Sequence, residues 1–107
     1  MHARVTQFEI DTLRIPLADA ERLFDEVVVP GLRQQPGLAG YYVMRTPEGK
    51  GLVVTLWESR EAATSGIESG YYAEQVAQFV TFMRQPPGRE QYEVIRAETP
   101  DGILGRG

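Results

Sequence analysis

The sequence predicts one α+β domain of ferredoxin-like βαββαβ order, in which an antiparallel sheet carries both helices on one face. Three observations support this fold class. A chain of 107 residues has the length of a single domain. Stretches with an apolar period of two alternate with stretches of period near 3.6, in the order expected for four strands and two helical segments. Two of the strands are also apolar on both faces, so one side of the sheet needs a further cover.

The first third of the chain predicts a strand and a helix. Residues 3–15 alternate β-branched or aromatic side chains with polar ones, which indicates strand one. After Pro16, apolar residues recur every three or four positions up to residue 28, as in an amphipathic helix. Pro30 and Gly31 are expected to interrupt this helix, since proline lacks an amide donor, although residues 32–35 have room for one more turn after a kink.

A hairpin is predicted in the middle of the chain. After Pro36 and Gly37, residues 38–46 and 52–58 form two apolar strands, and residues 47–51 (PEGKG) form the loop that joins them. Ser59 is then expected to cap a short helix over residues 60–63, because its hydroxyl can accept a hydrogen bond from a free amide of the first turn.

The last third predicts a longer helix, a final strand and a tail. Gly66 and Gly70 are expected to keep the short helix short. Apolar residues lie on one face of a helix over residues 71–84, and residues 90–97 form the last strand. The domain therefore spans residues 1–97. Residues 98–107 contain too few apolar side chains for a packed element, so this tail is expected to be mobile or to lie on a partner.

The two central strands predict a homodimer. Residues 41–44 and 52–57 place large apolar side chains on both faces of the sheet. Both helices belong to crossovers that pack on the same side, so they cover only one face. The second face would be a large exposed apolar patch, and such a patch usually marks an interface. A second copy of the chain is the simplest way to cover this face of the sheet.

Composition excludes several classes of function. The 11 basic and 15 acidic residues give a formal charge of −4, and the arginines are not clustered, which disfavours nucleic-acid binding. The chain has no cysteine and only one histidine, His2, so neither a thiolate nucleophile nor a metal site is expected. No apolar run is long enough to span a membrane and none resembles a signal peptide, so a cytoplasmic location is expected.

Three short motifs resemble those of the antibiotic-biosynthesis-monooxygenase family. They are QPGL at residues 35–38, GYY at residues 40–42 and LWESREA at residues 56–62. The resemblance extends over residues 3–97 and implies a dimeric α+β barrel, in which two sheets close together and a ligand cavity lies between helices and sheet. Some members of that superfamily oxidise polyketide or quinol-type substrates without a metal or organic cofactor, so no cofactor is expected here.

The heme-degrading branch of the superfamily is not expected to include this chain. The resemblance implies, for that branch, an asparagine in strand one, a tryptophan in the short helix and a heme-ligating histidine in the long helix. This sequence has Asp11 or Thr12, Gly66 and Val76 at the matching positions. A shared fold does not imply a shared function unless the residues of the functional site are also present. Heme oxygenase activity is therefore disfavoured.

Candidate site residues follow from the chemistry that a cofactor-free monooxygenase needs. The substrate supplies the electrons as a carbanion or phenolate, so the protein needs an apolar cavity, a proton acceptor and a positive or hydrogen-bonding group. The pocket candidates are Phe24, Val54, Trp57, Tyr72, Val76, Phe79 and Met83. The candidates for charge are Arg45 and Arg84, and those for the base are Glu9, Asp11 and Glu58. The tyrosines that could orient a phenol are Tyr41, Tyr42, Tyr71 and Tyr72.

Each candidate has an ordinary structural role as its alternative. Trp57 also suits packing in the core or the interface, and the charged residues also suit a solvated surface. Three interpretations of the whole chain therefore stay open. It is a monooxygenase acting on an aromatic or quinol-type compound, a non-catalytic ligand-binding or sensing dimer, or an accessory protein that binds another polypeptide.

Overall fold

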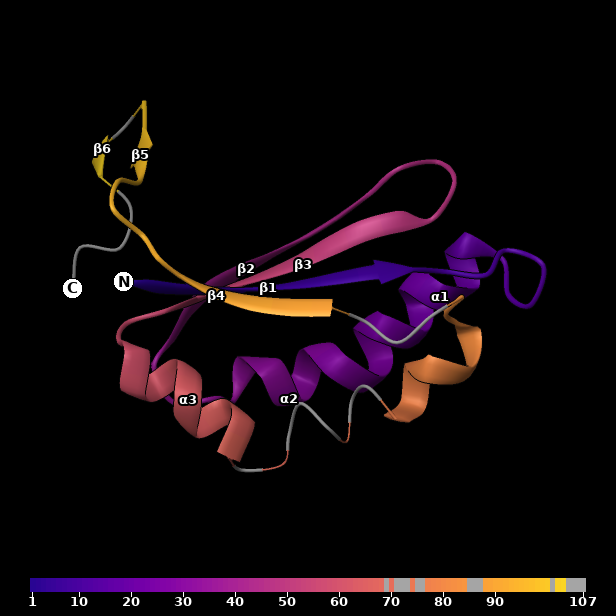
Figure 1. The fold of residues 1–107 in the computed structure, drawn as a ribbon, viewed down its shortest axis with the longest axis horizontal. Coiled ribbons are helices and arrows are strands. Elements are labelled where there is room, and N and C mark those ends of the chain that lie inside the picture. Colours follow the sequence, from indigo (N-terminus) through magenta and orange to yellow (C-terminus); the bar gives the residue numbers. More distant parts are fainter. Residues whose placement is uncertain (69, 71–73, 75–76, 85–87, 101, 104–107) are drawn as a thin grey trace.

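A computed structural model describes residues 1–68, 70, 74, 77–84, 88–100 and 102–103. Four strands form one antiparallel sheet in the order β2-β3-β1-β4: β1 His2–Glu9, β2 Leu38–Arg45, β3 Lys50–Trp57 and β4 Gly88–Glu93. The helices all lie on one side of this sheet (Figure 1). The predicted α+β ferredoxin-like class is confirmed.

The first helix is longer than predicted. It runs without a break through α1 (Leu17–Leu23), a π-helical segment (Phe24–Val28) and α2 (Val29–Arg33). The predicted interruption at Pro30 is wrong. In the π-helical segment the Val29 amide donates to the Phe24 carbonyl, five residues back, which widens the helix directly before Pro30. The widened turn accommodates a residue that lacks the amide of a regular α-helical turn.

The second helix begins as predicted and ends later. α3 spans Arg60–Glu68, and the Ala62 amide donates to Ser59 Oγ at 3.0 Å, which confirms Ser59 as the N-cap. The helix continues through Gly66, and Gly70 follows with φ of 82°, a conformation that favours glycine. Of the longer helix predicted over residues 71–84, residues 71–73 and 75–76 lie outside the described residues, and residues 74 and 77–79 are helical. Its described end is a 3-10 turn, Val80–Phe82, after which Met83 pairs with Ile10.

The first strand ends earlier than predicted, because Asp11 starts a turn. The Arg14 and Ile15 amides donate to the Asp11 carbonyl, and the Leu13 amide donates to Asp11 Oδ1. This Asx-type turn leaves no extended backbone after Ile10.

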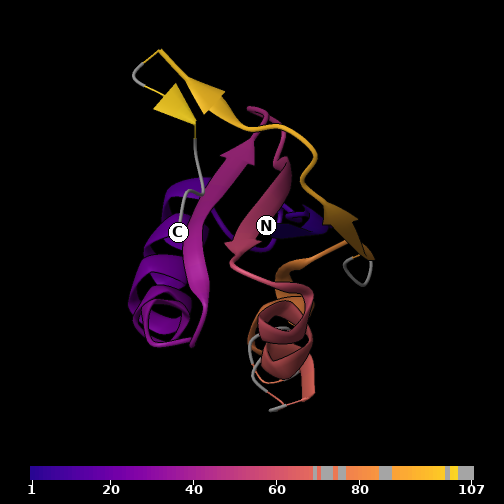
Figure 2. The same ribbon diagram turned by 90° about the vertical axis from the view of Figure 1, so that its left-hand side faces the viewer.

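The C-terminal part of the chain differs from the prediction in two ways. β4 ends at Glu93, which pairs with His2, and one more bond follows, from the Val94 amide to the Met1 carbonyl at 3.0 Å. Residues 95–97 of the predicted strand are not in a strand. The tail does contain an element of its own, a small antiparallel ribbon of β5 (Glu98–Thr99) and β6 (Gly102–Ile103). The ribbon projects from the body of the molecule at the end of the long axis where the N-terminus lies (Figure 1), and Figure 2 shows it from that end.

The pairing register separates the two faces of the sheet. Arg4, Thr55 and Tyr41 lie side by side on the helix side, and Val5, Val54 and Tyr42 lie side by side on the outer side. The helix side carries the core, in which Trp57 and Leu32 are almost fully buried. The outer side is open, and Tyr42, Met44 and Tyr92 are about half exposed there.

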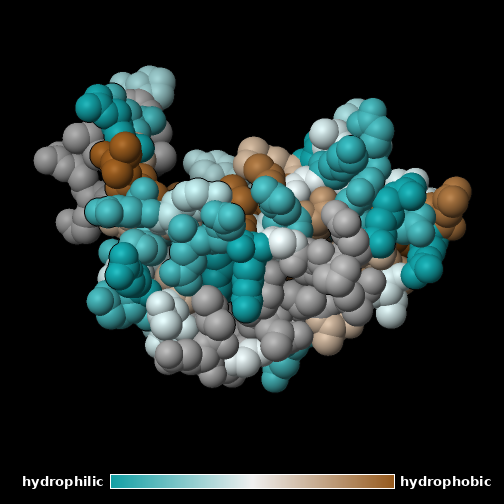
Figure 3. Space-filling model, viewed as in Figure 1, coloured by the Kyte–Doolittle hydropathy of each residue, from teal (hydrophilic) through white to brown (hydrophobic). Residues whose placement is uncertain are grey.

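Two single apolar residues are also exposed away from the sheet. Leu13, in the turn after β1, and Ile95, after β4, are each exposed by at least 90%. Figure 3 shows apolar atoms near both ends of the long axis, while the surface over β4 and α3 is largely hydrophilic. Isolated exposed apolar residues are common on protein surfaces and define no site by themselves.

Candidate functional site

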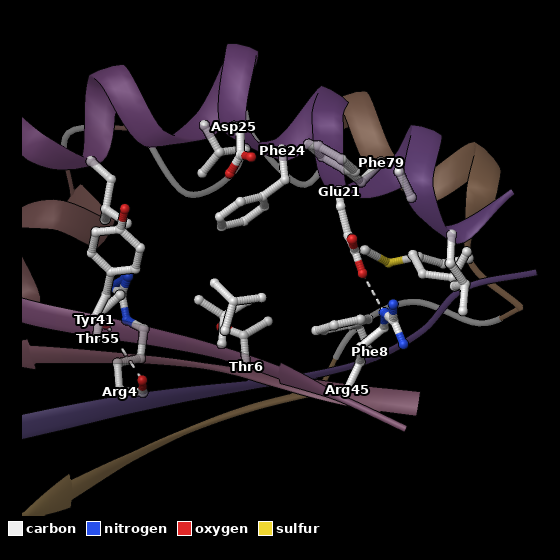
Figure 4. Close-up of a pocket in the computed structure, with 18 of the residues that line it drawn as sticks. Arg4, Thr6, Phe8, Glu21, Phe24, Asp25, Tyr41, Arg45, Thr55 and Phe79 are labelled. Atoms are coloured by element: carbon white, nitrogen blue, oxygen red, sulfur yellow. Dashed lines mark hydrogen bonds and ion pairs between the residues drawn. The ribbon is translucent and has the colours of Figure 1, made fainter. Parts of the chain in front are cut away.

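A cavity of about 380 Å³ lies between the first helix and the sheet (Figure 4). This volume is in the usual range for a small-molecule site. Its described lining comprises Arg4, Thr6, Phe8, Ile10, Leu17, Ala20, Glu21, Phe24, Asp25, Val28, Leu32, Tyr41, Val43, Arg45, Val53, Thr55, Trp57, Phe79 and Met83. Most of these side chains are apolar, and the polar ones other than Thr6 lie at the two ends and on the helix wall.

The floor of the cavity consists of cross-strand rows on the helix side of the sheet. The first row is Arg4–Thr55–Tyr41, the second is Thr6–Val53–Val43 and the third is Phe8–Gly51–Arg45. Successive rows are two residues apart, so the first and third rows are about 13 Å apart at the usual rise per strand residue. The floor is therefore polar, then mostly apolar, then aromatic and polar again.

The first row forms the deep end of the cavity. Arg4 and Thr55 are exposed by only 5% and 8%, and the adjacent Trp57 by 2%. The Trp57 indole Nε1 donates to Thr55 Oγ1 at 2.9 Å, and the Thr55 hydroxyl donates to the Arg4 carbonyl at 3.4 Å. Arg4 Nη2 donates to the Ala63 carbonyl of α3 at 3.2 Å. These bonds hold the side chains of the deep end in fixed positions.

The third row forms the shallow end. Arg45 Nε is bonded to Glu21 Oε1, so this ion pair connects the edge strand β2 to α1 across the cavity (Figure 4). Both side chains are at least one third exposed. Gly51 leaves the space in which the Phe8 ring lies, because a Cβ at Gly51 would overlap that ring and the Met44 carbonyl. The shallow end thus combines an aromatic floor with a solvent-exposed ion pair.

The helix wall includes the π-helical segment. Three of its residues, Phe24, Asp25 and Val28, line the cavity. The Phe24 ring lies 6.2 Å from the Phe79 ring at an angle of 58°, an edge-inclined arrangement that aromatic pairs favour. The Asp25 carboxylate lies on the cavity side of the helix beside Phe24 (Figure 4). π-helical segments are frequent at functional sites.

The structure brings together six of the predicted site residues. The cavity is lined by Phe24, Tyr41, Arg45, Trp57, Phe79 and Met83. Val54 does not line it, because it alternates with Val53 and Thr55 and so points to the outer face of the sheet. Tyr72 and Val76 lie outside the described residues, as does Tyr71.

The other predicted polar residues lie away from the cavity. Arg84 Nε is 3.5 Å from Glu9 Oε2, and Arg84 Nη2 is 4.0 Å from Asp11 Oδ1, while the second oxygen of Asp11 pairs with Arg14. This network joins the end of β1 to the segment after the 3-10 turn. Glu58 is exposed after β3. None of Glu9, Asp11, Glu58 and Arg84 lines the cavity.

Three charged residues of the cavity were not among the sequence candidates. Arg4 lies in a strand and Glu21 and Asp25 lie on a helix, where charged side chains usually face solvent. Glu21 and Asp25 are four residues apart, so regular helical spacing already places both on the side of the helix that carries Phe24. Arg4 would have been found only from the register that pairs it with Thr55.

Two further classes of site are not seen in the described part of the chain. Among its histidine and acidic residues, no group of three is arranged to hold a metal ion. None of its helices is long and apolar enough to cross a membrane.

Solved structures share this fold. A protein of unknown function from Nitrosomonas europaea is 18% identical with a TM-score of 0.73, over 94% of this chain and 95% of that one. SnoaB, a cofactor-independent oxygenase from Streptomyces nogalater, is 11% identical with a TM-score of 0.73, over 90% and 94%. The ActVA-Orf6 monooxygenase of Streptomyces coelicolor, solved with nanaomycin D, is 20% identical with a TM-score of 0.71, over 92% and 91%.

Sequence comparison identifies the family. Among proteins of curated function, none matches the chain. The family model for antibiotic biosynthesis monooxygenase matches residues 5–65, which is more than half of the chain. That span includes the three motifs and most of the cavity wall, from β1 to the first half of α3. The chain belongs to the antibiotic biosynthesis monooxygenase family.

Proposed function

We propose that this protein binds an aromatic small molecule in the cavity and oxidises it with dioxygen, without a metal or organic cofactor. The observation that supports the proposal is the cavity itself, about 380 Å³ of mainly apolar space with Trp57 at its deep end. A flat ring system can lie against Trp57, Phe8 and Phe24, because aromatic faces stack well. SnoaB and ActVA-Orf6, which share the fold, support the reaction class by analogy.

The proposed reaction converts a phenol to a quinone. A base removes the phenolic proton, and the electron-rich phenolate reduces dioxygen and forms a carbon–oxygen bond to it. The resulting hydroperoxide loses water and leaves a carbonyl. Phenol and dioxygen thus give quinone and water, and the ring supplies both electrons that reduce the second oxygen atom. The protein needs only to orient the ring, accept the proton and exclude side reactions.

Asp25 is the proposed proton acceptor. It is one of two carboxylates on the cavity wall, and the other, Glu21, is bonded to Arg45. Among described residues, no ion pair or hydrogen bond of the Asp25 side chain is found. Its exposure to water gives the accepted proton a route to solvent. A base at this position is therefore in reach of both ligand and water.

The test uses the single tryptophan of the chain. Since Trp57 lines the cavity, its fluorescence should change when a naphthol or hydroxynaphthoquinone binds. Turnover is then measured as oxygen uptake, with ¹⁸O₂ incorporation into the product. Binding with no oxygen uptake across a panel of phenols would indicate a ligand-binding protein instead. A failure of every aromatic compound to alter Trp57 fluorescence would contradict the proposal as a whole.

Asp25→Asn is expected to lower the turnover rate at least about a hundredfold, the usual contribution of a general base, with little change in binding. Glu26→Gln, one position along the same helix, is the matched control, because Glu26 is exposed and outside the cavity lining. Equal turnover in the two variants would remove Asp25 from this role.

We further propose that the protein is a homodimer joined through the outer face of the sheet. Apolar residues from three strands lie there, including Val5, Val54 and Tyr42. Exposed apolar surface of this kind usually marks an interface. A second copy would also cover Tyr92 on the edge strand β4.

A further inference from the structure

We propose that Tyr41 is the residue that orients the ligand, because its hydroxyl donates a hydrogen bond to an oxygen substituent of the aromatic ring system. The inference rests on the proposed function in one respect, that an aromatic small molecule enters this cavity. It adds the chemical group by which the ligand is recognised, an oxygen that accepts a hydrogen bond. It also gives the direction in which the ligand lies, with that oxygen at the deep end.

The first support is the position of the Tyr41 side chain. Tyr41 lies beside Thr55 in the first cross-strand row, so it faces the helix side of the sheet, and it lines the cavity. In Figure 4 its ring rises from β2 with the hydroxyl toward the helix wall, at the end of the cavity opposite to Arg45. The residue is partly buried. A ligand at the deep end of the cavity is therefore within reach of this hydroxyl.

The second support is that the Tyr41 hydroxyl is available to a ligand. Among described residues, this hydroxyl has no hydrogen-bond partner. The neighbouring Thr55 hydroxyl is different, because it accepts from the Trp57 indole and donates to the Arg4 carbonyl. The Arg4 guanidinium likewise donates to the Ala63 carbonyl of α3. A tyrosine hydroxyl can donate and accept, so Tyr41 can bond to a ligand without the loss of any of these bonds.

The third support is the energetic effect of a hydroxyl in a mainly apolar cavity. A ligand that fills the cavity displaces water from the Tyr41 hydroxyl, and a hydroxyl that loses water without gaining a partner is destabilising. A ligand with an acceptor oxygen at this point avoids that cost, whereas a hydrocarbon of the same shape does not. Tyrosine also has few rotatable bonds, so little conformational entropy is lost when the hydrogen bond forms. Tyr41 should therefore discriminate between ligands by the presence of an oxygen.

The order of the cross-strand rows determines how the rest of the ligand lies. Next to the Tyr41 row is the row with Val43 and Val53, and the row with Phe8 follows, about 13 Å from the first by strand geometry. Phe24 lines the helix wall above them. A planar ring system with its oxygen at Tyr41 would lie along the two valines and extend toward Phe8. The inferred ligand is therefore a fused aromatic compound with a carbonyl or hydroxyl oxygen at one end.

The test compares three naphthalene probes in the native protein and in Tyr41→Phe. 2-Acetylnaphthalene carries a carbonyl oxygen, 2-naphthol carries a hydroxyl, and 2-isopropenylnaphthalene has a CH2 group in place of the carbonyl oxygen. Their dissociation constants are measured by equilibrium dialysis. Tyr41→Phe should weaken the binding of the oxygen-bearing probes by about threefold to tenfold, as expected for one neutral hydrogen bond, and leave that of the hydrocarbon unchanged. The larger of the two losses identifies the preferred oxygen, carbonyl or hydroxyl.

Tyr42→Phe is the matched control. Tyr42 is the next residue of β2 and faces the outer side of the sheet, so the loss of its hydroxyl should leave all three affinities unchanged. Tyr41→Phe should also unfold at the same urea concentration as the native protein, because its hydroxyl has no partner among described residues. An equal effect of Tyr41→Phe on all three probes, no effect on any of them, or a loss of stability would overturn the inference and leave the proposed function intact. If no probe binds the native protein, the proposed function fails as well.

Discussion

The hydroxyl group of Thr55 makes hydrogen bonds to two other residues of the cavity wall. It accepts from the Trp57 indole and donates to the Arg4 carbonyl, and all three residues are buried. The hydroxyl thereby sets the plane of the indole and the position of the strand that carries the guanidinium. A change at Thr55 should alter both stability and ligand binding, even though Thr55 need not touch the ligand itself.

Thr55→Val is expected to lower the free energy of unfolding by about 1–3 kcal/mol, because it leaves the buried indole N–H without its acceptor. The same substitution in a Trp57→Phe background should cost less by about 0.5–1.5 kcal/mol, since no donor is then left unpaired. Urea unfolding of the four proteins, at one protein concentration, measures this coupling. Additive effects would contradict the described bond. Thr55→Ser, which keeps the hydroxyl, is the control for lost packing.

The alternation of side chains between the two faces of a strand explains which cavity residues could be predicted from the sequence. Trp57, Phe24, Phe79 and Met83 were expected because they are large, apolar and close to the family motif or the helical stripes. Val54 was equally apolar, but it is an odd number of residues from Trp57 and so faces the other side of the sheet. Arg4 depends on the register between β1 and β3, which involves residues more than 50 positions apart and leaves no local signal.

The first helix shows how one element shapes the cavity wall. A regular α-helix would place residues 24–28 with a period of 3.6, whereas the π turn inserts extra backbone and rotates the residues after it. Phe24, Asp25 and Val28 line the cavity from this segment. The Val29 amide bonds five residues back, immediately before Pro30. The proline and the shape of the wall are therefore linked.

Pro30→Ala is expected to raise the free energy of unfolding, by less than the ~3 kcal/mol that proline costs inside a regular helix, because the π turn already accommodates it. Pro16→Ala is the matched control and should lower stability slightly, since Pro16 precedes the helix with the extended backbone that proline favours. Chemical denaturation of both variants checks the signs. Destabilisation by Pro30→Ala would mean that the proline stabilises the π turn.

Element boundaries were predictable where local chemistry sets them and not where a partner strand does. The Ser59 cap fixes the start of α3, and the glycine-containing loop fixes the hairpin. The end of β4 instead depends on its pairing with β1, in which Glu93 lies opposite His2 and the Val94 amide donates to the Met1 carbonyl. The end of β1 was missed for a local reason, the Asp11 turn, which the alternating pattern of residues 3–15 concealed.

At the scale of the whole molecule, one face of the sheet is covered by helices and the other is exposed. The helix face carries the cavity and the buried core, while the outer face leaves Tyr42, Met44 and Tyr92 about half exposed. Val54 lies between Val5 and Tyr42 near the middle of that face. The proposed dimer would bury this surface without altering the cavity, so assembly and ligand binding can be tested separately.

Val54→Glu is expected to convert the dimer to a monomer, because a carboxylate at the centre of an apolar interface loses hydration without gaining a partner. In the monomer the same carboxylate remains in water, so the fold and its circular dichroism should be retained. Ala18→Glu, on the exposed side of α1, adds the same charge and should leave the dimer intact. Sedimentation velocity at micromolar concentration measures all three proteins. A monomeric native protein, or a Val54→Glu variant that stays dimeric, would show that the outer face of the sheet is not where two copies meet.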